Sequence, residues 1–211
     1  MRLGTYYRWH LLRRLGLHRV SGRVLDIGCF DGFWAASLEG AEPHGVDVDL
    51  QPLYRIVRYV RASGMRLPFK DGVFDTVFAI DVIEHVPDER ELIMEALRVL
   101  RPTGRVILTT PNSTISVFPK VLQPWIDKQW GHHRVRGFSV GYLRGLLEEL
   151  PLSDVSITPL AISAFRWGYV LLRLVWALPG PLGGWIAAAA AAWDARHLKG
   201  DRGTVLVQIT R

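Results

Sequence analysis

Cysteine and lysine are both scarce in this 211-residue sequence. The single Cys29 excludes an internal disulfide framework and makes a reducing compartment the default expectation. Lysine occurs at four positions, so 22 of the 26 basic residues are arginine, which suits phosphate groups and anionic surfaces. The N-terminal stretch MRLGTYYRWHLLRRLG is too interrupted by charge for a secretory signal. We therefore expect a cytoplasmic protein, and the net charge of +6 leaves nucleic acid and acidic lipid as partners to weigh.

Two common nucleotide-binding signatures are missing from VLDIGCFDGFW, residues 24–34. This stretch has neither the G-K-[ST] of a phosphate loop nor the G-x-G-x-x-G spacing of a dinucleotide site. It has a short apolar run that contains Asp26, and then a turn with Gly28 and Gly32. Such a turn between a strand and a helix lets backbone N–H groups approach a ligand closely. The acid Asp26 suits a cationic or ammonium-bearing ligand better than a pyrophosphate.

The same stretch resembles motif I, D-x-G-x-G-x-G, of the class I S-adenosylmethionine-dependent methyltransferases. Asp26, Gly28 and Gly32 match the motif, and Phe30 stands where the family most often has its middle glycine. The resemblance implies that S-adenosyl-L-methionine is the cofactor and that these residues hold its methionine end.

A second acidic stretch extends the resemblance. HGVDVD, residues 44–49, is typical of a short strand that ends in acids, and Asp47 matches the acidic motif II position of the family. A carboxylate at the end of a second parallel strand can accept two hydrogen bonds from a ribose diol. We therefore predict that Asp47 binds the ribose, with Val48 beside it and Asp49 as the alternative acid.

Residues 61–88 resemble the family pattern D-A-x-x-L-P-F-x-D-x-x-F-D, which is followed by a strand and E-H-V. Ser63 replaces the acid that usually faces the adenine amino group. The resemblance therefore implies that the adenine lies among Ser63, Gly64 and the soft side chain of Met65.

Asp81, Glu84 and His85 follow the next strand at spacing i, i+3, i+4, which would bring them to one face of a helical turn beside the cofactor. Three readings stay open: capping of that turn, an acid/base cluster, and a divalent metal site. The ubiquinone-pathway O-methyltransferases have a similar E-x-x-E-H implicated in metal binding. We predict that Glu84 and His85 are catalytic and that Asp81 contacts the cofactor, and we assign no metal ligand.

Two further histidines precede a predicted helix. GHHRVRGFSVGYLRGLLEEL, residues 131–150, resembles the family's H-x-x-x-x-F-[ST]-x-x-x-L-x-x-L-L stretch, whose helix would start near Ser139. Because histidine titrates near neutrality, His132 and His133 join the candidate bases for an oxygen acceptor.

The remaining pattern sets the expected elements. An amphipathic basic helix over residues 5–17 would cover the cofactor pocket or dock on the sheet. The first strand should start near Arg23, and a helix through Leu38 should end at Gly40. Asp88 and Glu91 form a capping box for a helix that runs to about Leu100, where Pro102 and Gly104 stop it.

Two apolar insertions lie outside the minimal fold. Residues 113–135 would roof the active site, as in the quinone-pathway enzymes, where that segment also contacts the membrane. Residues 161–198 separate the last two predicted strands and carry only Arg166 and Arg173 as charges before Asp194. We expect a helical hairpin that lies on a bilayer, over the substrate, or at a dimer interface.

The sequence thus predicts a single α/β methyltransferase domain over residues 1–211, with a doubly wound, mostly parallel, seven-stranded Rossmann-like sheet, helices on both faces and an N-terminal cover helix within residues 1–20. We expect O- or C-methylation of a hydrophobic small molecule such as a quinone precursor, isoprenoid or lipid. RNA methylation and a non-catalytic cofactor-binding module are the alternatives. The expected location is cytoplasmic, with peripheral contact to the inner face of the membrane, and a homodimer is possible in principle.

Overall fold

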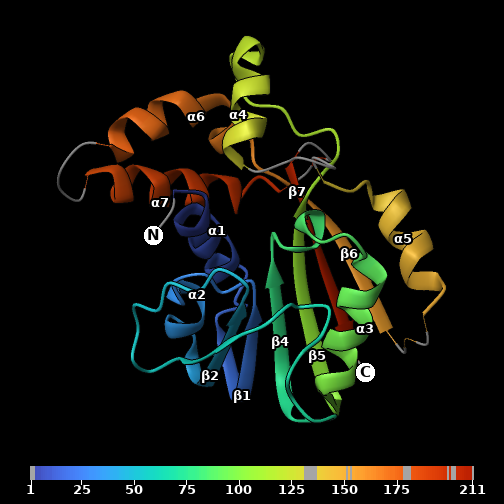
Figure 1. The fold of residues 1–211 in the computed structure, drawn as a ribbon. Helices are drawn as coiled ribbons and strands as arrows, with labels where there is room; N and C mark the ends of the chain where they lie inside the picture. The colour runs from blue at the N-terminus through green and yellow to red at the C-terminus, as the bar shows by residue number, and fades with distance from the viewer. Residues whose placement is uncertain are drawn as a thin grey trace.

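A seven-stranded sheet forms the centre of the protein (Figure 1). The computed structural model describes residues 3–130, 137–150, 152, 154–177, 182–198, 200 and 203–210. The strands are β1 (Arg19–Ile27), β2 (Glu39–Asp47), β3 (Arg58–Arg61), β4 (Phe74–Ile80), β5 (Leu100–Pro111), β6 (Asp154–Ala161) and β7 (Gly203–Thr210). Their order is β3-β2-β1-β4-β5-β7-β6, with β7 antiparallel to both of its neighbours and the other pairs parallel. The predicted doubly wound, mostly parallel sheet is confirmed.

The helices connect and cover these strands. They are α1 (Leu3–Arg14), α2 (Phe33–Ala36), η1 (Ile83–His85), α3 (Glu89–Val99), η2 (Lys120–Leu122), α4 (Gln123–Trp130), α5 (Val140–Glu148), α6 (Ser163–Trp176) and α7 (Leu182–Asp194). Among the described residues, no helix is both long and apolar enough to cross a membrane.

Each face of the sheet buries its own apolar core, because successive strand side chains point to opposite faces. On β4, Val77 packs with α3 and α5, whereas Phe78 packs on the other side with α1, α6 and α7. Burial of such side chains stabilises the fold by roughly 1.5–3 kcal/mol each before the loss of conformational entropy is counted. The second core therefore joins the N-terminal helix and the late helices to the centre of the sheet.

Two predicted boundaries are wrong. Strand β1 begins at Arg19, not near Arg23, because Ser21 and Gly22 lie inside the strand at a register shift against β2. Helix α2 has only four residues, and β2 starts at Glu39 with Gly40 inside it. The predicted end of the next helix near Leu100 is confirmed, since α3 ends at Val99, but β5 follows at once, and the expected stop residues 102 and 104 lie inside that strand.

Two predicted helix starts are confirmed by their caps. The Asp88 carboxylate accepts the Glu91 N–H at 2.9 Å at the start of α3. The Ser139 hydroxyl oxygen accepts the Tyr142 N–H at 3.1 Å at the start of α5. In both cases the side chain satisfies a backbone donor that the first turn leaves unpaired.

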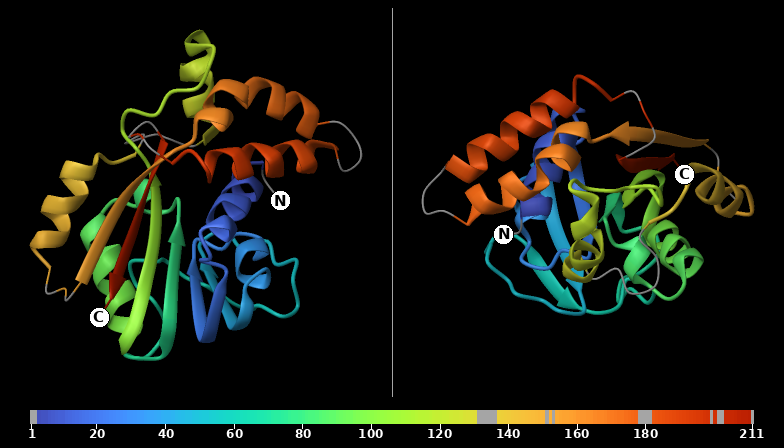
Figure 2. Two further views of the ribbon diagram at one scale, coloured as in Figure 1. Left: turned by 180° about the vertical axis from the view of Figure 1, so that it is seen from behind. Right: turned by 90° about the horizontal axis from the view of Figure 1, so that it is seen from above.

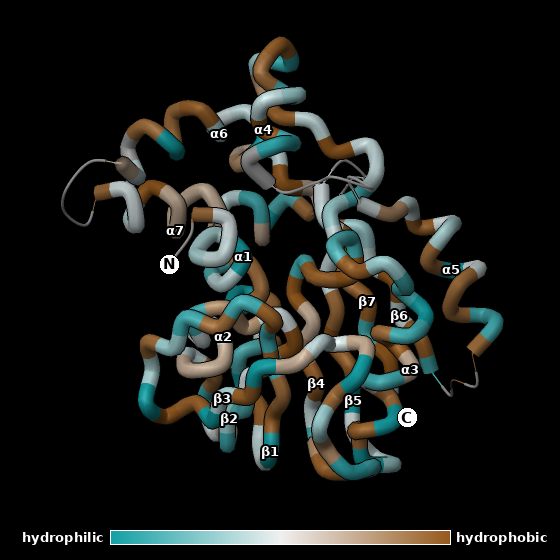
Figure 3. The backbone as a smooth tube through the Cα atoms, in the orientation of Figure 1, coloured by the Kyte–Doolittle hydropathy of each residue, from teal (hydrophilic) through white to brown (hydrophobic). Residues whose placement is uncertain are grey.

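A helical cap lies at the carboxyl end of the parallel strands (Figures 1 and 2). We define the cap as residues 113–130 together with α6 and α7; α1 lies directly beneath α7. The apolar character of α6 is visible along its length in Figure 3. Ile126 of α4, Phe165 of α6 and Leu11 of α1 belong to one buried cluster, so the cap and α1 pack as a unit.

Buried polar contacts tie the cap together. The Tyr7 hydroxyl donates to Asp194 Oδ2 at 2.5 Å, and the other oxygen of Asp194 accepts the Ala164 N–H at 2.8 Å. Arg166 Nε donates to the Ser116 carbonyl oxygen at 2.6 Å, which joins α6 to the first insertion. Since Asp194 is fully buried, these contacts set the position of both cap helices relative to α1.

Candidate active site

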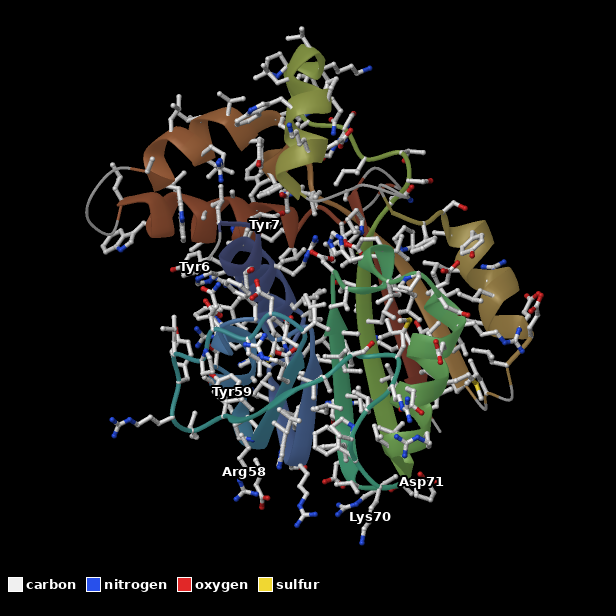
Figure 4. All side chains as sticks on the ribbon, viewed as in Figure 1. Tyr6, Tyr7, Arg58, Tyr59, Lys70 and Asp71 are labelled. Carbon is white, nitrogen blue, oxygen red and sulfur yellow. The ribbon has the colours of Figure 1, made fainter. Side chains whose placement is uncertain are left out.

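The loop after β1 has the tight geometry that its glycines permit. Gly28 and Gly32 have φ angles of 77° and 81°, and Phe30 has a φ of 46°. A Cβ on Gly28 would lie 2.3 Å from a methyl of Val82, and one on Gly32 would lie 2.0 Å from the Tyr59 hydroxyl. A side chain at either position would therefore clash and strain the backbone. In Figure 4, Tyr59, the neighbour of Gly32, lies far from the cap helices, whereas Tyr6 and Tyr7 lie close to them.

Asp26 lies at the end of β1 with 2% of its surface exposed, and its Oδ2 has no hydrogen-bond partner. Burial raises the pKa of this carboxyl well above its usual range, and the nearby Asp47 raises the pKa further. An unpaired buried carboxylate is costly unless a donor or a cation reaches it. The side chain therefore fits the ammonium-bearing end of a ligand, as the sequence predicted.

Asp47, at the end of β2, connects two loops at the carboxyl edge of the sheet. Its Oδ2 accepts the Phe30 N–H at 2.8 Å, and its Oδ1 accepts the Asp49 N–H at 2.8 Å. Each carboxylate oxygen keeps a second lone pair, so the acid can still accept hydrogen bonds from a diol. Asp49 is exposed and contributes its backbone N–H to this arrangement. Between Asp47 and Asp49, Val48 is 65% exposed.

The predicted adenine loop also lies at this edge. The Ala62 N–H donates to the Asp47 carbonyl oxygen at 3.2 Å, and the Ser63 hydroxyl oxygen accepts the Met65 N–H at 3.2 Å. A Cβ on Gly64 would lie 2.6 Å from a methyl of Ile27, so the loop packs directly against the end of β1. The structure thus brings Ser63, Gly64 and Met65 beside the motif I strand.

Asp81 follows β4 with a φ of 54°, an unusual backbone conformation for a residue with a side chain. Its Oδ2 accepts hydrogen bonds from Arg8 Nη2 at 2.6 Å and Arg8 Nε at 3.0 Å. Its Oδ1 accepts the Thr109 hydroxyl at 2.8 Å. Both carboxylate oxygens therefore have protein donors, and the N-terminal helix reaches the end of β4.

Sequence reasoning missed Arg8 and Thr109. Arg8 belongs to the predicted basic helix over residues 5–17, yet it is 7% exposed and bonded to Asp81. Its partner is 73 positions away in the sequence, so helical spacing alone gave no signal for this contact. Thr109 lies inside the buried strand β5, and nothing in the sequence distinguished its hydroxyl from a packing residue.

Glu84 and His85 lie on η1, next to Asp81. Glu84 is 3% exposed, and one of its carboxylate oxygens has no partner. Burial, followed by the charge of Asp81, raises the pKa of Glu84 well above its usual range. The more exposed His85 has its Nε2 4.0 Å from Glu84 Oε1. This pair can hold or pass a proton at the edge of the site.

Within the described residues, no group of three His, Cys, Asp or Glu side chains is arranged to hold a metal ion. The donor set around Asp81 also differs from a metal site, because a guanidinium already neutralises its carboxylate. His132 and His133 lie outside the described residues, so their predicted role stays a prediction.

A separate pocket of about 330 Å³ begins at Val86, the residue after η1. Val86, Glu89, Ser113, Phe138 and Tyr142 line it, so it lies between the starts of α3 and α5. None of the predicted cofactor residues lines this pocket.

Residues 25–108 match the family described as a methyltransferase domain. This match and the named relatives support the class I S-adenosylmethionine-dependent methyltransferases as the family that this chain resembles.

Relatives of several kinds share this domain. An uncharacterized methyltransferase of Mycobacterium sp. (strain KMS) is 43% identical over 94 residues, which cover 41% of this chain and 37% of the relative. A chloroplastic tocopherol O-methyltransferase of Arabidopsis thaliana is 34% identical over 49% of this chain and 34% of its own length. A ubiquinone biosynthesis O-methyltransferase of Vibrio parahaemolyticus is 25% identical over 72% of this chain and 73% of its own. The chain thus spans well under half the length of the mycobacterial and plant relatives.

Solved structures show the same fold. A methyltransferase of Thermotoga maritima, titled a possible histamine N-methyltransferase, aligns with a TM-score of 0.63 at 18% identity, over 98% of this chain and 91% of that chain. Phosphoethanolamine N-methyltransferase 2 of Haemonchus contortus, solved with S-adenosyl-L-methionine, aligns with a TM-score of 0.62 at 18% identity. This alignment covers 95% of this chain and 51% of that chain.

Proposed function

We propose that this chain is a methyltransferase that uses S-adenosyl-L-methionine to methylate an oxygen or carbon atom of a hydrophobic small molecule. The observation that carries the proposal is the gathering of Asp26, Asp47 and the Gly28–Gly32 loop at one edge of the sheet, next to an apolar helical cap. A quinone precursor, an isoprenoid or another lipid-like molecule fits such surroundings. The tocopherol and ubiquinone enzymes among the relatives support this substrate class.

Each predicted cofactor residue would bind a different part of S-adenosyl-L-methionine. The unpartnered oxygen of Asp26 would hold the ammonium group, and Asp47 would accept hydrogen bonds from the ribose. Gly64 and Met65 would flank the adenine from the loop beside Ile27. S-adenosyl-L-methionine supplies a methyl group on a sulfonium centre, which is already reactive toward an aligned nucleophile.

Positioning and exclusion of water then account for much of the expected acceleration. Helix α1 and the cap supply apolar side chains next to the carboxyl ends of β1 and β4, and the Arg8–Asp81 pair would hold α1 against the site. An oxygen acceptor must also lose a proton. His85 would take that proton, and the adjacent Glu84 would orient or share it.

RNA methylation is the alternative that the basic charge suggested, and no comparison supports it. The decisive experiment therefore offers both acceptor classes. Purified protein is incubated with cofactor labelled on the methyl group and with either a lipid extract or total RNA. We expect label in the organic phase only, and less label with Asp47→Ala protein. Label that appears in RNA alone would contradict the proposal.

We also propose that the protein works in the cytoplasm, as the single buried cysteine suggested. Fluorescent fusion to either end, followed by fractionation, tests this location.

A further inference from the structure

The outer face of the cap carries an unusual concentration of exposed apolar side chains. Large hydrophobic residues more than half exposed occur on all its helices: Val121, Trp125, Trp167, Leu171, Leu174, Leu182, Trp185 and Trp193. We call this set the apolar face of the cap. Soluble monomers rarely expose contiguous apolar patches above a few hundred square ångströms, and larger ones mark interaction sites.

The spacing of these residues gives them common sides of their helices. Trp167, Leu171 and Leu174 occur at i, i+4 and i+7 of α6, opposite the buried Tyr169 and Leu172. On α7, Leu182, Trp185 and Trp193 recur at helical spacing, while Ala187 and Ala191 are buried. Each helix is therefore apolar on both sides: one side fills the core, and the other has no covering element in the described part of the chain. Figure 2 shows α4, α6 and α7 together at one end of the molecule.

The charge around this face has one sign. Lys120, Lys128 and Arg173 are exposed, and so is Arg196 just after α7. Of the cap's acids, Asp194 is fully buried, and the half-buried Asp127 accepts a hydrogen bond from the Gln123 side chain at 2.7 Å. The described cap residues therefore present cations and apolar groups together, without an exposed acid.

Arg166, the other arginine of α6, has a different role. It is 7% exposed and bonded to Ser116 through Nε and Nη2. The inward arginine anchors α6 on the first insertion, and the outward one is available to a partner surface. The stacked rings of Phe118 and Trp167, 3.6 Å apart, strengthen the same junction and hold Trp167 at the edge of the face.

We propose that the apolar face of the cap docks on an anionic lipid bilayer, with α6 and α7 lying in the interfacial plane. Tryptophan and leucine side chains enter the boundary between headgroups and acyl chains, and the surrounding lysines and arginines bind the anionic headgroups. The exposed cations around this face are complementary in charge to the anionic headgroups of such a bilayer. Docking would bring the carboxyl edge of the sheet next to the bilayer.

Liposome flotation of the full chain tests the proposal. We expect the protein to float with vesicles that contain phosphatidylglycerol and to bind pure phosphatidylcholine at least tenfold more weakly. Arg173→Glu should weaken binding to the anionic vesicles by more than about fivefold, the effect of one basic residue near such a surface. Leu174→Ser combined with Trp185→Ser should weaken it by at least tenfold.

The matched control is Leu53→Ser combined with Ile56→Ser, because these side chains are equally exposed, at 67% and 65%, but lie in the loop after β2. We expect this variant to float like the parent protein. Absence of flotation, or equal loss in both double variants, would overturn the proposal. A dimer that the cap variant alone makes monomeric, without vesicle binding by the parent, would identify an interface between copies instead. Because vesicle binding is measured without methyl transfer, failure here leaves the proposed activity untouched.

Discussion

Arg8, on the N-terminal helix, forms a bidentate contact with Asp81 after β4, with Nη2 and Nε at 2.6 and 3.0 Å from the same carboxylate oxygen. The two residues are 73 positions apart in the sequence. Arg8 is nearly buried, whereas the side chain of Asp81 is 30% exposed. The pair therefore couples the helix beneath the cap to the turn that carries Glu84 and His85.

Replacing Arg8 by alanine should destabilise the protein and weaken catalysis. The change removes charge-assisted hydrogen bonds worth about 1.5–3 kcal/mol and leaves Asp81 in a strained conformation with fewer donors. Urea unfolding and turnover measured together check this expectation. Arg13→Ala, on the exposed side of the same helix, is the control and should change neither the stability nor the turnover by much.

A double-mutant cycle with Asp81→Ala separates the ion pair from helix propensity. We expect the two changes to be non-additive, since either one alone removes the contact. Simple addition of their effects would show that the contact contributes little.

Glu84 should make the protein less stable as the pH rises. Burial raises the pKa of Glu84 in the folded state above its ordinary value of about 4.3. The folded state then binds a proton that the unfolded state has released, so stability is full below pH 4.3 and is lost as pH rises toward the folded pKa. The loss is about 1 kcal/mol for each pH unit in that window.

The isosteric change Glu84→Gln removes this dependence. We expect the stability difference between the two proteins to shift in favour of the variant as the pH rises above 4.3, while its methyl transfer falls. Glu91→Gln, whose side chain is exposed on α3, should follow the parent at every pH. If the free energies of unfolding of the parent and of Glu84→Gln depend on pH in the same way, the Glu84 carboxyl ionises as readily in the folded protein as in the unfolded chain.

Asp47→Ala should lose affinity for S-adenosyl-L-methionine. The change removes the predicted ribose acceptor and also the acceptor of the Phe30 and Asp49 N–H groups, at a cost of about 1–3 kcal/mol. Titration calorimetry measures the loss directly, and Asp49→Ala is the control because its side chain makes no comparable contact to the loop. Unchanged affinity in Asp47→Ala would remove the assignment.

Much of the fold could be predicted because its signals are local. Short apolar runs and the caps at Asp88 and Ser139 identified strands and helices within short windows. The failures occurred where tertiary pairing overrides local signals. Pro102 and Gly104 are typical of a helix stop, but pairing with β4 carries the chain straight into β5. Gly40 likewise lies in β2 because its neighbours pair with β1.

In the candidate site, too, residues placed by local signals could be predicted, and residues placed by tertiary packing could not. Asp26, Asp47 and the glycines could be named because strand ends fix them by chain position. Arg8 could not, because only the packing of α1 under α7 turns its side chain inward. Nothing in the spacing of Tyr7 and Asp194 indicated that they meet, since 187 residues separate them.

The contact between Tyr7 and Asp194 should contribute to the stability of the cap. Asp194 accepts hydrogen bonds from the Tyr7 hydroxyl and from the Ala164 and Phe165 N–H groups. Tyr7→Phe should cost about 1.5–3 kcal/mol, because a buried carboxylate loses a donor. Asp194→Ala should cost more, since it leaves the tyrosine and the first turn of α6 without their acceptor.

The pH dependence distinguishes this contact from simple packing. Burial, with the charge of Asp194 adding to it, raises the pKa of Tyr7 above its ordinary value of about 10. The folded state keeps the phenol proton, so this stabilisation is full below pH 10 and is lost as the pH rises further. Urea unfolding at pH 8 and pH 10.5 should show the gap between parent and Tyr7→Phe narrowing at the higher pH. Tyr6→Phe is the matched control on the same helix, because Tyr6 is not among the donors to Asp194. A constant gap for Tyr7→Phe would mean that the Tyr7 hydroxyl ionises in the folded protein as freely as in the unfolded chain.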